Sequence, residues 1–273
     1  MTSQALMDLA PAVFYGTVAV MSVVERLSPI QPLEKLSAKH IFVNVGLSIV
    51  TGIPSLFGLA LLMAASTWAT SHRFGLLNLV ELPLGVRLFV AMVGIDFADW
   101  LRHLANHKVP WFWRLHRVHH MDAHADATTA LRAHPFEHAL AYPFFALWVL
   151  VLGLDPLCLA VRTLITSTLL AWHHSAVRLP LWLDRTIALV TPTPRSHRQH
   201  HSRDVTFTDT NYGTLFTWWD RLFGTWSPVT KWKPEKTGLD GFDSPQRQTL
   251  WGQLRSFTQE PDAAPLSSTS QKS

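Results

Sequence analysis

The hydrophobic positions of this chain gather into long uncharged runs rather than into short alternating stretches. Residues 9–24 contain no charged side chain, and no basic residue precedes them. A cleavable signal peptide has a positive amino-terminal region, so we expect a retained membrane anchor here. Residues 41–65 form a second uncharged run, which is long enough to cross a hydrocarbon core of roughly 30 Å even if Pro54 bends the helix. Residues 1–95 are therefore predicted to hold the amino-terminal membrane spans.

The next apolar segments differ in kind. Residues 85–107 begin apolar and become polar at Asp96, Asp99 and His103, which indicates one helix that leaves the bilayer and continues into the aqueous layer. Residues 139–154 and 157–172 are two apolar halves separated by Asp155-Pro156. Sixteen helical residues reach only about 24 Å, so we expect a helical hairpin over 139–172 that dips into the membrane and returns. The alternative, core helices of a soluble globular protein, conflicts mainly with the run at 41–65.

The carboxyl-terminal part has a weaker pattern. Ser244-Pro245 is typical of an N-cap followed by a first-turn proline. After it, one helical face carries the apolar residues Leu250, Trp251, Leu254 and Phe257, flanked by Arg247 and Arg255. This pattern predicts an amphipathic interfacial segment within residues 231–257. Residues 258–273 have no periodic pattern and are expected to form a disordered tail.

Composition supports a membrane protein and excludes some functions. Of the 273 residues, 48% are hydrophobic and 15% are charged, whereas a soluble domain has about a quarter charged residues. The single cysteine, Cys158, excludes an internal disulfide and any CxxC site. The net charge of +4 is not gathered into a basic arm, which argues against nucleic-acid binding. We predict an all-α integral membrane helical bundle.

Basic residues predict the orientation of this bundle. Arg26, Lys35 and Lys39 lie between the first two spans, and further basic residues follow the third, whereas residues 66–86 hold only Arg73. The positive-inside rule therefore places residues 103–201 on the cytoplasmic face of a multi-pass protein, in either a bacterial inner membrane or the endoplasmic reticulum. Ser202 and Ser66 are predicted to lie on opposite sides of the membrane.

Histidines carry the candidate chemistry. Thirteen of the 15 histidines lie between positions 103 and 201, and three clusters stand out as HLANH, HRVHH and HRQHH. The clusters contain His103, His107, His116, His119, His120, His197, His200 and His201. Imidazole suits Fe, Zn, Cu or Ni, and eight such groups exceed what one tetrahedral ion can use. The sequence therefore predicts a cap lined by histidines that holds two metal ions.

The spacing within each cluster indicates how the rings are shared. Residues four apart on a helix lie on one face, so the pair His103 and His107 can reach one ion. The first and last histidines of the two H-x-x-H-H clusters also share a face, while His119 and His200 point aside. Each cluster can thus serve two neighbouring ions. We expect carboxylates to hold the ring N–H groups, with Asp96 and Asp99 foremost and Asp122, Asp126, Glu137, Asp204 and Asp209 as further candidates.

At this point the chain resembles the fatty acid hydroxylase and sterol desaturase superfamily of membrane-bound non-haem di-iron oxygenases. DFADWLRHLANH, WRLHRVHH and TPRSHRQHHS are similar to its three histidine boxes and occur in its order. The connecting segments DATTALRAHPFEH, HHSAVRLP, DTNYG and WDRLFGTW are similar as well. The likeness runs over residues 96–225. Two departures are Leu104, where the family usually has arginine after the first histidine, and Ala176, where it often has asparagine.

The resemblance implies a di-iron domain over residues 96–230 and an O2-dependent enzyme that hydroxylates or desaturates a lipid. It implies that the eight histidines above are catalytic iron ligands and that His174 is a further ligand. Zinc can replace iron in purified protein, because Zn(II) binds nitrogen sites more tightly than Fe(II). Fatty acyl, sterol, sphingoid, carotenoid and ether lipids remain open as substrates. The rival function is a membrane metal-binding or transport protein without oxygenase activity, which would need ligands deep in the spans.

Electrons are expected from a partner, because no nicotinamide, flavin or phosphate-binding motif is visible. The resemblance points to a cytochrome b5-like protein or a ferredoxin with its reductase. Arg102, Lys108 and Arg117 are expected to attract such an acidic carrier. The segment 211–213 and the pair at 219–220 are interpreted as structural parts around the site.

The remaining histidines have less specific interpretations. His134 is either a ligand or a residue that orients Glu137, because the position before a proline is held in extended backbone. His124, His138 and His173 are expected to support the ligands or lie at the surface. His40 and His72 are expected at the membrane interface.

Overall fold

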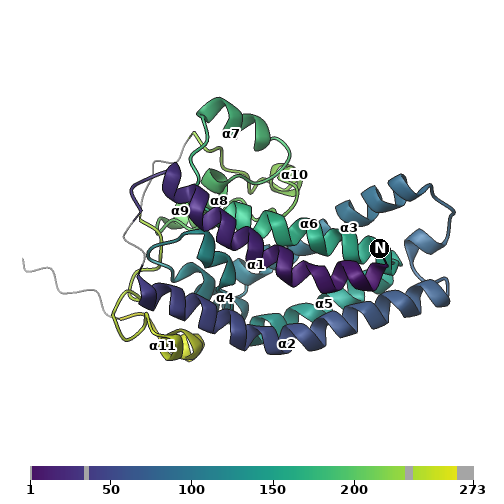
Figure 1. Ribbon diagram of the computed structural model, residues 1–273, viewed down its shortest axis with the longest axis horizontal. Coiled ribbons are helices and arrows are strands. Elements are labelled where there is room, and N and C mark those ends of the chain that lie inside the picture. The colour runs from purple at the N-terminus through teal and green to yellow at the C-terminus, as the bar shows by residue number, and fades with distance from the viewer. Residues whose placement is uncertain (1, 34–36, 231–235, 263–273) are drawn as a thin grey trace, which may run out of the picture.

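The computed structural model describes residues 2–33, 37–230 and 236–262, and this part of the chain is helical. Within it, pairing of extended backbone is limited to two isolated bridges, Pro29 with Val177 and Ser202 with Thr237. The predicted all-α fold is confirmed (Figure 1). The long helices are α1 (Ser3–Leu27), α2 (Ala38–Ser71), α3 (Leu84–Lys108), α4 (Pro110–His120), α5 (Pro135–Leu152) and α6 (Pro156–His174). The short ones are η1 (Leu76–Asn78), η2 (Ala127–Leu131), α7 (Leu181–Ile187), α8 (Pro194–His200), α9 (Val205–Thr208), α10 (Trp218–Leu222), α11 (Leu250–Arg255) and η3 (Ser256–Thr258).

Three described segments are long and apolar enough to cross a membrane. They are Ser3–Leu27, Ala38–Asn78 and Pro135–Leu152. The predicted spans at 9–24 and 41–65 lie within α1 and α2. On α2, the side chains of Ile49, Ile53, Leu56 and Phe57 are exposed over successive turns, which is expected of a face that lies against lipid. The chain is a membrane protein.

Helices α5 and α6 form the predicted hairpin, and each arm is longer than the sixteen residues predicted from the apolar runs. The helices have 18 and 19 residues, so each extends about 27 Å. The Asp155 carboxylate caps α6 by accepting the N–H groups of Leu157 and Cys158. At the hairpin tip, Ser66 Oγ of α2 donates to the Leu154 carbonyl oxygen at 2.6 Å. The tip therefore reaches the end of the bundle at which α2 ends.

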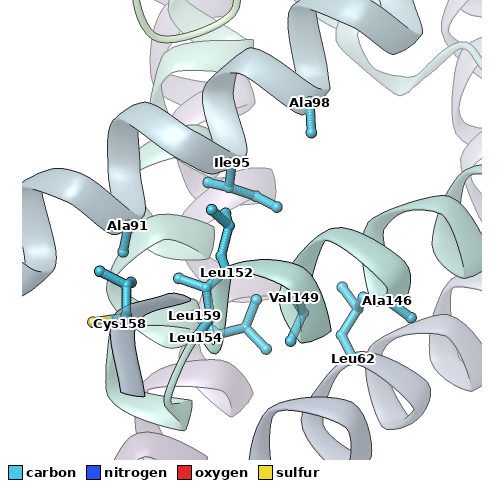
Figure 2. Packing of buried hydrophobic residues seen from close by; sticks show 11 residues of the cluster. Leu62, Ala91, Ile95, Ala98, Ala146, Val149, Leu152, Leu154, Cys158 and Leu159 are labelled. Carbon is cyan, nitrogen blue, oxygen red and sulfur yellow. The ribbon is translucent and has the colours of Figure 1, made fainter. Parts of the chain in front are cut away.

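Each arm of the hairpin is covered by one amino-terminal helix. α2 runs along α5, and α1 runs along α6 (Figure 1). Figure 2 shows an apolar cluster in which Ile95 of α3 meets Leu152 of α5, Leu159 of α6 and other side chains of these helices. The cluster involves the part of α3 that precedes the first histidine box. Packing there holds α3 in place, so that its last turns present His103 and His107 to the other boxes.

The carboxyl-terminal prediction is partly wrong. The helix begins at Leu250 rather than at Ser244, because Thr249 Oγ1 accepts the N–H of Gly252 and caps it. Leu250 and Leu254 pack on Val43 and Leu47 of α2, so most of the apolar stripe faces the protein itself.

The predicted tail is ordered where it is described. Residues 259–262 are held by ion pairs, at 2.6 Å between Arg247 and Asp262 and at 2.7 Å between Arg114 and Glu260. Residues 263–273 lie outside the described part.

Candidate metal centre

The histidine boxes are carried by three helices whose ends are defined by local sequence. α3 presents the first box, and α4 begins at Pro110, whose missing N–H suits a first helical turn. α8 begins with Pro194, and its first turn is closed by a capping box in which the Thr193 and Ser196 side chains bond each other's backbone N–H. His201 is the C-cap of α8.

These three helices and the end of α6 bring nine imidazoles into two groups. In each group one ligand nitrogen per ring lies within 4.8 Å of the others. The first group contains His103, His107, His116, His120 and His200, and the second contains His119, His174, His197 and His201. All eight histidines predicted from the boxes are present, together with His174 at the end of α6.

Each of the two H-x-x-H-H clusters contributes two rings to one group and one ring to the other, and the group that receives two rings differs between the clusters. His116 and His120 belong to the first group and His119 to the second, whereas His197 and His201 belong to the second and His200 to the first. The groups are adjacent, because the rings of His120 and His201 stack with their centroids 4.5 Å apart. Neighbouring residues on one helix thus contribute rings to two groups, which is the arrangement that the spacing predicted.

Hydrogen bonds fix the tautomers of six of these rings. Each Nδ1 faces an acceptor: Tyr212 O for His103 (2.9 Å), Arg132 O for His119 (2.9 Å), Leu170 O for His174 (2.7 Å), Thr210 O for His200 (2.7 Å), Glu137 for His116 (2.9 Å) and Asp209 for His107 (3.3 Å). A carbonyl or carboxylate oxygen only accepts, so Nδ1 carries the hydrogen. In a neutral ring, Nε2 is then left with a free lone pair.

Those lone pairs converge without a hydrogen between them. The Nε2 atoms of His119 and His174 are 2.9 Å apart, and those of His103 and His200 are 3.1 Å apart. Two lone pairs at such a distance repel each other unless a cation lies close to both. The donor set therefore fits metal ions, with Nε2 as the ligating atom and Nδ1 held from outside.

Burial keeps the rings in the form that binds metal. Burial, and then the neighbouring imidazoles His174 and His116, hold the pKa of His119 well below its usual value, and burial lowers the pKa of His200 in the same way. Hydrogen bonds from His107 and Lys108 lower the pKa of Asp209 to about 2, despite partial burial. Near pH 7 the rings of His119 and His200 are therefore neutral, and the Asp209 carboxylate is ionised.

Asp96 and Asp99 do not hold the ring N–H groups, so that prediction is wrong. Asp99 pairs with Arg162 of α6. Asp96 accepts the backbone N–H groups of Leu215 and Phe216 and the indole N–H of Trp219. Both carboxylates are one or more turns before His103 on α3, but they face other partners.

Glu137 and Asp209 are the predicted carboxylates that do contact box histidines. Asp122 instead bonds Thr129 and His40, and Asp126 and Asp204 cap η2 and α9. The four carbonyl oxygens that hold the remaining rings had no sequence signal, because every residue type carries a backbone carbonyl.

The other histidines lie outside both groups. His134 caps α5, and its Nε2 lies 3.1 Å from the Leu254 carbonyl oxygen. His40 is partly buried, and its Nε2 lies 3.0 Å from Asp122 Oδ1. His72 is exposed and stacks on Trp68. His173 is buried, with its ring centroid 5.7 Å from that of His197.

The segment 211–213 positions one of the carbonyls. Asn211 has φ +58°, and the Asp220 carboxylate accepts the N–H groups of Tyr212 and Gly213. Asp220 also accepts the indole N–H of Trp100. These bonds hold the Tyr212 carbonyl on His103, which agrees with the structural role interpreted from the sequence.

Two of the three cations expected to attract an electron carrier are engaged inside the protein. Arg117 is buried and donates to the carbonyl oxygens of Ser256 and Gln259. Arg102 donates to Glu137 at 3.2 Å. Only Lys108 is largely exposed, and its ammonium bonds Asp209 at 2.6 Å.

A cavity of about 350 Å³ leads from the membrane helices to the two groups. Its walls come from α1, α2, α5 and α6, and it contacts His103 and His116 of the first group and His119, His174 and His197 of the second. A volume of this size is typical of a site for a small molecule.

Comparisons with known proteins agree with this geometry. The family model described as fatty acid hydroxylase matches residues 88–225. Ornithine lipid hydroxylase OlsE of Rhizobium tropici is 24% identical over 238 residues, which are 84% of this chain and 70% of that protein. Alkylglycerol monooxygenase of Homo sapiens is 30% identical over 137 residues, which are 50% of this chain and 30% of that protein. Cholesterol 25-hydroxylase of Mus musculus is 30% identical over 151 residues, which are 54% of this chain and 48% of that protein.

The chain spans about a third of the length of the alkylglycerol monooxygenases it matches. No solved structure matches it significantly.

Proposed function

Because this chain belongs to the fatty acid hydroxylase family, we propose that it is a membrane-bound oxygenase that uses two iron ions, O2 and external electrons to hydroxylate a lipid. The observation that carries the proposal is the pair of adjacent imidazole groups at the end of a cavity lined by membrane helices. The catalytic region is residues 96–230, and residues 1–95 supply the amino-terminal spans.

The nine histidines would hold one ion in each group. Neutral imidazoles cancel none of the charge of the ions, and two such ions supply the redox chemistry that O2 reduction requires. Around them, this chain keeps the rings buried and oriented. Glu137 and Asp209 provide the negative charge, each against the outer nitrogen of a ring in the first group.

Hydroxylation is favoured over desaturation by the names of the relatives reported above, which are hydroxylases or monooxygenases. Electrons would come from a carrier such as a cytochrome b5-like protein or a ferredoxin with its reductase. By the positive-inside rule, the histidine groups would face the cytoplasm. Iron would be the active metal, and zinc could occupy the same sites in purified protein.

The test combines metal content with isotope labelling. Full-length protein reconstituted with Fe(II) and an electron donor, under ¹⁸O2, should convert a host lipid into a product that has gained one ¹⁸O atom. Without the donor, conversion should stop. A protein that binds two metals but never modifies lipid under any donor would favour the metal-carrier function. A product that has lost two hydrogens would assign desaturation.

A further inference from the structure

The cavity that reaches the histidine groups has a hydroxyl-rich wall, although it lies among membrane helices. This wall is formed by Thr51 and Ser55 of α2, His138 of α5, and Thr163 and Ser167 of α6. A site built only for a hydrocarbon chain would be lined by apolar side chains, because polar groups cost free energy when they are buried against hydrocarbon. The polar groups of this wall therefore indicate that the ligand has a polar group of its own.

The hydrogens of the four hydroxyls on this wall are already used. Each hydroxyl donates to a backbone carbonyl oxygen: Thr51 to Ala133 (2.9 Å), Ser55 to Thr51 (2.8 Å), Thr163 to Leu159 (2.9 Å) and Ser167 to Thr163 (2.7 Å). A hydroxyl has one hydrogen and two lone pairs. What Thr51, Thr163 and Ser167 can still offer to a ligand is an acceptor, whereas the Ser55 oxygen also bonds side chains of α5.

His138 is an acceptor for the same reason. Its Nδ1 lies 2.9 Å from Ser55 Oγ, whose only hydrogen goes to the Thr51 carbonyl. Nδ1–H must therefore be the donor in this contact, and in a neutral ring Nε2 keeps a lone pair. The phenol of Tyr142 interacts with the same Ser55 hydroxyl.

Donors are found at the two ends of this cavity. At the α1–α2 side, Tyr15 and Ser48 are joined by a hydrogen bond of 2.9 Å between their hydroxyls, which leaves one O–H free. At the metal end, the Arg102 guanidinium donates to Glu137. The stretch between these ends presents acceptors.

We propose that this cavity binds a lipid that carries a hydrogen-bond donor, an alcohol O–H or an amide N–H, along the segment that lies against His138 and Thr163. An ester or ether oxygen at that depth is itself an acceptor, so it would face the lone pairs of the hydroxyl oxygens and of His138. These acceptors would then stay without a hydrogen bond, which disfavours binding of lipids that have no donor. The inference rests on the proposed function for the reaction that follows binding. Binding itself requires no turnover.

The test compares matched ligands on the full-length protein in nanodiscs, under argon and without an electron donor. Hexadecan-1-ol is paired with its methyl ether, and N-methylhexadecanamide with N,N-dimethylhexadecanamide. Each is measured by displacement of a fluorescent fatty alcohol. We expect the member of a pair that keeps its hydrogen to bind about fivefold to tenfold more tightly, as one hydrogen bond to a buried acceptor would give. Tighter binding of hexadecan-1-ol than of its ether would identify an alcohol O–H as the donor that the cavity recognises. Tighter binding of the secondary than of the tertiary amide would identify an amide N–H.

Variants connect the preference to the wall. His138→Phe removes the ring acceptor, and Thr163→Val removes a hydroxyl with little change of shape. Each should lower the preference to about twofold or less. Thr168→Val is the matched control, since the Thr168 hydroxyl also donates to a backbone carbonyl of α6, that of Leu164, but on the exposed face. It should keep the full preference.

Equal binding of both members in both pairs would overturn the proposal, even if no variant folded. So would a full preference retained in both His138→Phe and Thr163→Val. A protein that prefers donors but never oxygenates lipid would contradict the proposed function alone. One that oxygenates lipid without any preference would contradict this inference alone.

Discussion

His119 and His200 occupy the same place in their two clusters, yet they belong to different metal groups. Each has its Nδ1 on a backbone carbonyl, so alanine at either position removes a pre-oriented ligand. We expect His119→Ala and His200→Ala each to lower the metal content from about two ions per chain toward one and to abolish lipid oxygenation. His72→Ala, at an exposed ring, should change neither. Elemental analysis measures the metal content, and the mass of the lipid product measures oxygenation. Full activity in His119→Ala would contradict the two-ion centre.

Glu137 provides the clearest test of a residue that holds a ligand from outside. Its carboxylate accepts hydrogen bonds from Nδ1–H of His116, from the Arg102 guanidinium and from the Asn106 side-chain amide. Glu137→Gln keeps an acceptor but removes the charge, so we expect metal affinity or activity to fall by about 10-fold, the low end for such partners. Asp99→Asn is the control, because Asp99 pairs with Arg162 and should leave metal affinity unchanged. Equal metal affinities in the two variants would refute this role of Glu137.

At the scale of elements, the contact of α2 with α5 depends on a helical glycine. A Cβ at Gly58 would lie 2.0 Å from Cγ of Tyr142, so Gly58→Ala must displace a ring that lies against the helix. We expect a loss of about 1–3 kcal/mol of stability, as for overpacked cores. Gly16→Ala on α1 meets nothing within 4 Å and should be neutral or stabilising. Thermal unfolding of the two variants in detergent measures the difference in stability. Equal unfolding midpoints for Gly58→Ala and Gly16→Ala would contradict this packing.

Periodicity and composition predicted α1, α2, α3, α5 and α6 because each carries an apolar run over several turns, and such a run is visible without tertiary contacts. The short carboxyl-terminal helix was less predictable. Ser244-Pro245 has the chemistry of a helix start, but Thr249 is the residue that caps the helix. Which of two capping sequences is used depends on where Leu250 and Leu254 find Val43 and Leu47 to pack against.

At the scale of the whole molecule, topology can be tested at two exposed sites. Ser66 and Ser202 are both buried, so labels would not reach them, whereas Ser71 and Thr206 are exposed. If the histidine groups face the cytoplasm, cysteine at Thr206 should react from that side and cysteine at Ser71 from the other. The native Cys158 is buried and should stay silent. Labelling of both sites from one side would exclude the proposed orientation.

The buried imidazoles also predict how stability depends on pH. Burial holds the folded-state pKa values of His119, His120 and His201 well below the unfolded value of 6.5, so below that pH the unfolded chain binds more protons. The stability of metal-free protein should be fully present above pH 6.5 and should fall as the pH drops from about 6.5 toward 5. Melting curves of chelator-treated protein measure this, with the metal-loaded protein as the comparison. A midpoint that is constant or rises on acidification would contradict neutral burial.

The sequence by itself determined the helical membrane fold and the division of the box histidines between two neighbouring groups, whereas His174 came from the resemblance to a known family. The reason is that the first two rest on local geometry: apolar length sets a span, and a spacing of four places two rings on one face. Tertiary structure alone decided what holds the rings. Asp99 is one turn from His103 yet faces Arg162, while Glu137 and four backbone carbonyls arrive from distant segments. Such contacts depend on how α3, α4, α5 and α8 pack, and no local pattern encodes the relative placement of helices.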